Sequence, residues 1–242
     1  MSANLIKSIG GILVCGYLLL LSVRDQLNFY IHPRYQTFTL IMAIVGIIFL
    51  AIDITLQLKS SKKVSSKTKR RISPASLIGV VILLLAYIIP PAALSPSSVA
   101  QRESPAPATT DSFCAMPTPS NGQTDISINR WRSALRSCSQ ANFFNGKNIT
   151  VIGFISRDIL QSYGYDYFYV TRYLISCCAV DSVPVKLLID NAHSNNHKDG
   201  TWIRVSGVLL QKIVNGKLEY VITNSQVTTI EEPSQPYELL GL

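Results

Sequence analysis

Three apolar stretches in the first hundred residues constrain the fold of this chain more than any other feature. They run over residues 5–23, 38–58 and 76–93, and charged residues or prolines mark their limits. A helix that crosses the hydrocarbon core of a bilayer needs about 17–25 mostly apolar residues. We therefore expect three transmembrane helices within residues 1–94. The first should be an uncleaved anchor, because no small-residue cleavage site follows it.

Positive charge is concentrated in the loop after the second stretch. Residues 59–71 hold seven Lys or Arg and no acidic residue. Short loops rich in Lys and Arg stay in the cytoplasm. Alternation across three helices then places the N-terminus inside and everything after residue 93 outside. The sequence thus predicts a multi-pass cell-membrane protein with a cytoplasmic basic loop and an extracytoplasmic C-terminal domain.

The distribution of charge also bears on the partners of the chain. The net charge of +8 lies entirely in residues 1–96, which hold ten Lys or Arg and two acidic residues, whereas residues 97–242 hold twelve of each. A domain that binds nucleic acid carries its basic patch on a folded face. Here the excess flanks apolar stretches, which points to the lipid bilayer and argues against nucleic acid.

The C-terminal part begins with a change in composition. Residues 95–122 are rich in Pro, Ser, Ala and Thr, which is typical of an extended linker. Within residues 123–242, apolar side chains at helical spacing predict a helix over 128–138, with Asp125 or Ser127 as its N-cap. The predicted fold class is a helical membrane part joined to a small, mainly β domain.

Five short strands should follow that helix. We expect them at residues 148–157, 167–176, 185–189, 202–213 and 217–230. Asn215-Gly216 lies between the last two and is a strong signal of a two-residue β-hairpin. One helix and five short strands favour a small β-barrel of the OB type, with a β-sandwich or an open sheet as the alternatives.

The residues with the most evident chemistry are the adjacent Cys177 and Cys178. Asp181 follows them, and His193 and His197 come within twenty residues. Thiolates bind soft or borderline transition metals. Neighbouring residues of a strand point to opposite faces, so both thiols reach one ion only if the backbone turns there. A metal site and a pair of inert, buried thiols are both compatible with this pattern, and the two histidines lie in a polar stretch typical of a solvated loop.

The other cysteines and motifs say less about function. Cys15 lies within the first apolar stretch and is best explained by packing. Cys114 and Cys138 could form a disulfide in an oxidising compartment, but their spacing does not fix that pairing. The sequence contains no hydrolase elbow, phosphate-binding loop, dinucleotide fingerprint or zinc-protease helix, so we expect a protein that is not an enzyme.

Several segments resemble one known family. They are residues 30–35, residues 90–95 and residues 172–181, with supporting matches at 153–155, 200–207 and 236–237. The most specific of them reads Arg-Tyr-Leu-Ile-Ser-Cys-Cys-Ala-Val-Asp over 172–181. Together they are similar, over nearly the whole chain, to the YcgQ-type family of bacterial permease subunits.

The resemblance implies an accessory, non-catalytic subunit that pairs with a larger polytopic permease and handles metal ions or another small solute. It also implies that Cys177, Cys178 and Asp181 are the site residues. Some relatives carry a His-rich stretch between the second and third helices, where this chain has the Lys- and Ser-rich loop 59–71. The alternative is a membrane-tethered metal-binding or thiol redox module that acts without a permease.

Overall fold

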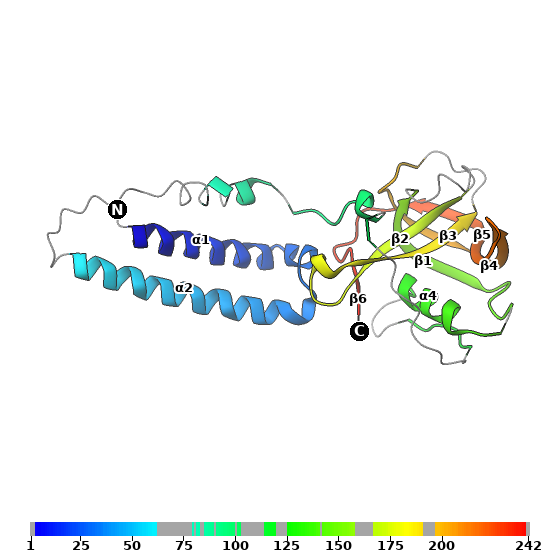
Figure 1. The fold of residues 1–242 in the computed structure, drawn as a ribbon, viewed down its shortest axis with the longest axis horizontal. Helices are drawn as coiled ribbons and strands as arrows, with labels where there is room; N and C mark the ends of the chain where they lie inside the picture. Colours follow the sequence, from blue (N-terminus) through cyan, green and yellow to red (C-terminus); the bar gives the residue numbers. More distant parts are fainter. Residues whose placement is uncertain are drawn as a thin grey trace. The chain divides into compact units, whose positions relative to one another are not determined.

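The chain forms two compact units, Met1–Ala92 and Ala93–Leu242. The fold is shown in Figure 1 as a computed structural model. It describes residues 3–61, 79, 81–82, 85–89, 91–99, 101–102, 114–119, 125–140, 142–157, 167–190 and 197–240.

The first unit is built on two long helices that lie side by side (Figure 1). They are α1 (Ala3–Val23) and α2 (Pro33–Ser61), joined through the short 3-10 helix η1 (Gln26–Phe29). Small residues allow the close approach, because a Cβ on Gly11 would lie 2.7 Å from Cδ1 of Leu50 and one on Gly46 would lie 3.1 Å from Sγ of Cys15.

One helix of this unit has the length and composition of a membrane span. Pro33–Lys59 has a mean hydropathy of 2.5, and only 6% of its most apolar window is buried inside the protein. A mostly exposed apolar helix is unlike the core helix of a soluble domain and supports membrane association. The described residues do not show the three membrane-spanning helices that the sequence predicts. The apolar helix Lys7–Val23 is shorter than a typical span. Seven of the eighteen residues of 76–93 lie outside the described residues, as do residues 62–71 of the basic loop.

Polar side chains connect α1 and α2 in a way that the sequence did not reveal. Oδ2 of Asp53 accepts hydrogen bonds from Oγ of Ser8 at 2.7 Å and from Nε2 of Gln57 at 2.6 Å. Because Ser8 belongs to α1 and is buried, its bond to Asp53 joins the two helices, whereas the bond from Gln57 to Asp53 lies within α2.

The second unit is built around a sheet closed into a barrel. Its elements are η2 (Pro96–Val99), α4 (Ile128–Ser137), β1 (Asn148–Ser156), β2 (Tyr167–Ile175), η4 (Ala179–Asp181), β3 (Val183–Asp190), β4 (Trp202–Val214), β5 (Lys217–Thr229) and β6 (Glu238–Leu239). Strand β1 pairs with both β4 and β2, which closes the order β1-β4-β5-β3-β2 into five strands. All these pairs are antiparallel except β3 with β5, and β6 adds to β2 in parallel. A closed five-stranded barrel is consistent with the predicted OB type.

Local sequence explains most of these elements. The turn between β4 and β5 has positive φ at Asn215 (49°) and Gly216 (74°), as its Asn-Gly sequence predicts. Gly153 allows β1 to approach β2, since a Cβ there would lie 2.5 Å from the carbonyl oxygen of Thr171. Of the two candidate N-caps of α4, Ser127 takes the role and accepts from the amide of Arg130 at 3.2 Å.

Helix α4 packs against β1, β2 and β3 beside the barrel (Figure 1). Its Trp131 is 1% exposed and joins the main hydrophobic core, where its ring meets that of Phe144 at 6.4 Å. Asp125, the other candidate cap, instead pairs with Arg204 at 2.6 Å. The helix therefore belongs to the barrel core and is not an independent element.

The beginning of the predicted linker also belongs to the barrel unit. Residues 93–99 and 101–102, here called the strap, run along the barrel. Val99 is 1% exposed and packs with Tyr173 and Tyr237. The amide of Leu94 donates to the Tyr237 hydroxyl at 3.2 Å, and the Tyr173 hydroxyl donates to the carbonyl of Ser95 at 3.0 Å. Fifteen of the twenty-eight residues of 95–122 lie outside the described residues. Residues 114–119 are described, and Cys114 is tied by a disulfide to Cys138, the C-cap of α4.

Candidate metal centre

The Cys177-Cys178 pair lies in a turn between β2 and β3. Strand β2 ends at Ile175, and η4 begins at Ala179, so neither cysteine is inside a regular strand. The Asp181 carboxylate closes the turn, because Oδ2 accepts from the amide of Cys177 at 2.7 Å and Oδ1 accepts from the amide of Ser176 at 3.2 Å. The backbone turn that a shared metal site requires is therefore present.

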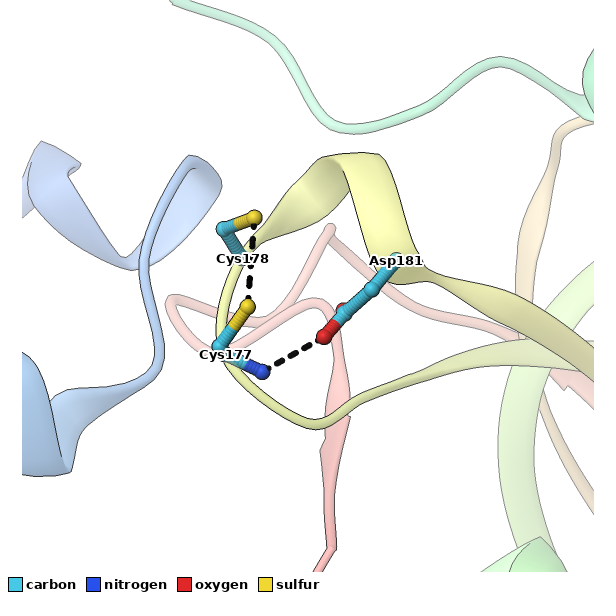
Figure 2. Close-up of side chains that lie close together, drawn as sticks. All are labelled: Cys177, Cys178 and Asp181. Carbon is cyan, nitrogen blue, oxygen red and sulfur yellow. Dashed lines mark hydrogen bonds between the residues drawn. The ribbon is translucent and has the colours of Figure 1, made fainter.

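Three ligand atoms converge in this turn. The Sγ atoms of Cys177 and Cys178 are 3.5 Å apart, and both lie within 4.8 Å of a carboxylate oxygen of Asp181. Figure 2 shows the two sulfur atoms next to each other and the Asp181 side chain pointing across the loop toward Cys177. Cys177 is exposed and Cys178 is half-buried, so the group is open to solvent. In the part of the chain that the structure describes, this is the one group of three or more His, Cys, Asp or Glu side chains with metal-binding spacing.

Hydrogen bonds within the group shift the pKa values of Cys177 and Asp181. The hydrogen bond to Asp181, followed by the one to Cys178, raises the pKa of Cys177 from 9.0 to about 12. Burial raises the pKa of Asp181, but hydrogen bonds from the Cys177 thiol and the amides of residues 176–178 outweigh it and lower that pKa overall. The Cys177 thiol thus keeps its proton at neutral pH next to a charged carboxylate, and a metal ion would have to displace that proton in order to bind.

The two histidines named from the sequence are not part of this group. His193 lies outside the described residues. His197 is described, and its carbonyl accepts from Nη1 of Arg157 at 2.9 Å, but its imidazole is not among the converging ligand atoms. The structure therefore brings together Cys177, Cys178 and Asp181 and adds no histidine to them.

Sequence reasoning did not identify Arg102 as part of this region. Its Nη1 lies within hydrogen-bond distance of the carbonyls of Ala179 (3.2 Å), Val180 (3.3 Å) and Ser182 (2.8 Å) and of Oγ of Ser182, and its two hydrogens are shared among these acceptors. The two segments are 77–80 residues apart in the sequence. A lone arginine in a Pro- and Ser-rich stretch carries no signal that could have predicted these contacts.

A second set of buried contacts supports the end of β2. Nε of Arg172 donates to the carbonyl of Pro236 at 3.1 Å, and its guanidinium also bonds the carbonyl of Gln235. Glu238, which is 5% exposed, accepts from the amides of Ile128 at 2.7 Å and Asn129 at 2.8 Å. Arg172 of the resembling motif is therefore part of the scaffold behind the turn and not a ligand.

Comparison with known proteins identifies a family similarity in the barrel unit. Residues 121–238 match the family model described as the DUF1980 C-terminal domain. No curated protein and no solved structure matches this chain. The matched region contains α4, the five barrel strands and the Cys177–Asp181 turn. The C-terminal domain of this chain is therefore similar to the DUF1980 C-terminal domain family, which supports the YcgQ-type resemblance at the level of that domain.

Proposed function

We propose that this protein is a non-catalytic subunit of a membrane permease and that its barrel domain binds a soft or borderline transition-metal ion through Cys177, Cys178 and Asp181. The observation that carries the proposal is the convergence of two thiols and a carboxylate within 4.8 Å in one turn. The apolar helix Pro33–Lys59 has the length and composition of the membrane anchor that such a subunit needs, which supports the proposal. The permease partner itself comes from the family resemblance.

The ligand set suits zinc or a similar ion. Around a tetrahedral zinc, two sulfurs at about 2.3 Å from the metal lie about 3.8 Å apart, so a separation of 3.5 Å between the Sγ atoms needs only a small adjustment. Three protein ligands leave one coordination position free. An exposed site with a free position can receive an ion from solvent and pass it on, whereas a structural zinc site is closed by four protein ligands.

The disulfide supports an extracytoplasmic position for the barrel. Disulfides persist in oxidising compartments and are rare in the cytosol, and Cys114 is bonded to Cys138. Together with the seven positive charges of residues 59–71, this favours an outward-facing metal site. Protease added to intact spheroplasts should digest the C-terminal domain. Full protection that is reversed only by lysis would contradict this topology.

The metal proposal is tested by zinc binding to the full-length protein in detergent, measured against a chelator of known affinity with the thiols reduced. We expect one zinc per chain. Cys177→Ser, Cys178→Ser and Asp181→Asn should each weaken binding by roughly a hundredfold or more, since losing even an outer partner of a ligand costs about 10–100-fold. Cys15→Ser is the matched control, because it removes a thiol from α1 in the other unit. Equal affinity in all four variants would refute the site.

The permease proposal has its own test. Affinity purification from cells at native expression, in a mild detergent, should recover a polytopic membrane partner. Recovery of the protein alone would count against the role of a permease subunit. It would leave the metal-binding test unaffected, and the tethered metal-binding module would then be the better description.

A thiol redox module is the second candidate, because two sulfurs 3.5 Å apart could be oxidised to a disulfide. The electrostatics argue against it. Redox-active cysteines have a lowered pKa that makes the attacking thiolate available, whereas the pKa of Cys177 is raised to about 12. Rapid, reversible formation of a Cys177–Cys178 disulfide in glutathione buffers would favour the redox function over the metal site.

A further inference from the structure

We propose that Arg102 is a positioning residue that holds the turn 176–182 in the conformation in which the three ligand atoms converge, an inference whose functional meaning rests on the proposed metal site. The guanidinium of Arg102 reaches three carbonyls of this turn, those of Ala179, Val180 and Ser182, within 3.3 Å.

The 3-10 part of the turn is short, and its own backbone hydrogen bonds are long. The 3-10 helix η4 comprises only Ala179–Asp181, and its internal bonds run from the amide of Asp181 to Cys178 at 3.2 Å and from the amide of Ser182 to Ala179 at 3.4 Å. Such turns are short because their hydrogen-bond geometry is poor. Arg102 donates hydrogen bonds to carbonyl oxygens at the end of this turn. Its positive charge also interacts favourably with the negative ends of the carbonyl dipoles.

Asp181 links this support to the ligands. It is the last residue of η4, and its carboxylate both closes the turn onto the amide of Cys177 and supplies the third ligand. If η4 moves, the carboxylate separates from the two thiols. Arg102 therefore acts on the metal site through Asp181, without touching the metal.

The strap gives Arg102 a firm base. Val99, three residues before it, is 1% exposed in a cluster with Phe154 and Ile175 of the barrel. The hydroxyls of Ser98 and Tyr173 share a hydrogen bond of 2.9 Å. The guanidinium therefore extends to the turn from a backbone that is already packed on the barrel wall.

The functional test uses the full chain in lipid nanodiscs with Co²⁺ as the probe, because cobalt bound to thiolate gives a charge-transfer absorption band. Arg102→Ala should weaken cobalt binding by about 10–100-fold, the usual effect of losing an outer partner of a metal ligand. It should also reduce the band per bound ion, since the two thiols and Asp181 no longer converge. Arg102→Lys should recover part of both losses, because it keeps the charge and a donor.

The matched control is Arg157→Ala. Arg157 is also half-buried and donates to a loop carbonyl, that of His197, and it pairs with Asp199 at 2.6 Å, yet it makes no bond to the turn 176–182. This variant should bind cobalt like the wild type and show the same band. Wild-type affinity and spectrum in Arg102→Ala would overturn the inference while leaving the metal site intact.

A measurement without metal keeps the two proposals separable. In Arg102→Ala, hydrogen–deuterium exchange should accelerate at the amides of Cys177, Asp181 and Ser182, which are bonded within the turn, and remain unchanged in α4. If the wild type binds neither zinc nor cobalt, the proposed function falls. The hydrogen–deuterium exchange measurement alone then tests whether Arg102 supports the turn. Unchanged exchange rates at these three amides in Arg102→Ala would refute that role.

Discussion

Replacing Glu238 with alanine tests how the C-terminal segment stabilises the barrel. The Glu238 carboxylate is 5% exposed and accepts from the first two amides of α4, those of Ile128 and Asn129, at 2.7 and 2.8 Å. A buried donor left without a partner costs about 1–3 kcal/mol, so two of them give a loss of about 2–6 kcal/mol. A typical domain has an unfolding free energy of about 5–15 kcal/mol, so this loss is a large part of the total.

Tryptophan fluorescence during urea unfolding measures this loss directly. The chain has two tryptophans, Trp131 and Trp202, and both lie in the barrel unit, so the signal reports on this unit alone. Glu238→Gln should lose less than Glu238→Ala, because it keeps one acceptor oxygen and buries no charge. Glu231→Ala, at an exposed position, is the control and should leave the midpoint unchanged. A loss below about 0.5 kcal/mol in Glu238→Ala would refute the capping role.

The same residue predicts a pH dependence. Burial raises the pKa of Glu238 above 4.5, although Arg172 and the two amides oppose that shift. The folded state therefore holds this proton more tightly than the unfolded state does, so the contribution of Glu238 to stability is full at low pH and declines as pH rises from 4.5 through the folded pKa. The stability advantage of the wild type over Glu238→Gln should shrink over that window, and a gap that widens would contradict the reasoning.

Three further outcomes follow from the turn and the disulfide. Asp181→Asn should speed alkylation of Cys177 at pH 8 by up to about thirtyfold. Lowering the thiol pKa from about 12 toward 9.0 raises the thiolate fraction about a thousandfold, but it also reduces the nucleophilicity of each thiolate. Peptide mass spectrometry after iodoacetamide treatment measures the rate, and an unchanged rate would exclude the hydrogen bond to Asp181 as the cause of the raised pKa. Zinc affinity, measured by chelator competition, should rise by about tenfold per pH unit for each thiol proton that the ion displaces, and a flat profile would speak against thiolate ligation. Cys114→Ser should lower the unfolding free energy of the barrel by about 3 kcal/mol, since the disulfide closes a loop of 24 residues; urea unfolding checks this, and equal stability of the oxidised and reduced wild type would contradict it.

The parts of the fold that the sequence predicted are those set by local pattern. Alternating apolar residues and the Asn215-Gly216 turn predicted the β4–β5 hairpin, and helical spacing predicted α4. Strand β3 begins at Val183, two residues before the predicted start at residue 185. Pro184 lies in the pairing with β2, at the second residue of the strand, where its missing amide hydrogen is tolerated.

The parts that were missed depend on contacts between distant segments. Strand β6 has only two residues and carries no periodicity, and the strap is a Pro- and Ser-rich stretch in which Val99 gives no pattern. The sequence named Cys177, Cys178 and Asp181 as candidate ligands, and the structure brings them together, but the sequence could not predict the turn that brings the two adjacent thiols together. It depends on Asp181 and Arg102 acting from outside the pair.

Zinc K-edge X-ray absorption of the zinc-loaded, full-length protein tests the metal site most directly, because it reports which atoms surround the ion. We predict two sulfur neighbours at about 2.3 Å and oxygen neighbours at about 2.0–2.2 Å, from Cys177, Cys178, Asp181 and one exchangeable ligand. The sulfur shell should disappear in the Cys177→Ser/Cys178→Ser double variant. A first shell of oxygen and nitrogen only in the wild type, or a sulfur shell that persists in the double variant, would contradict the proposed site.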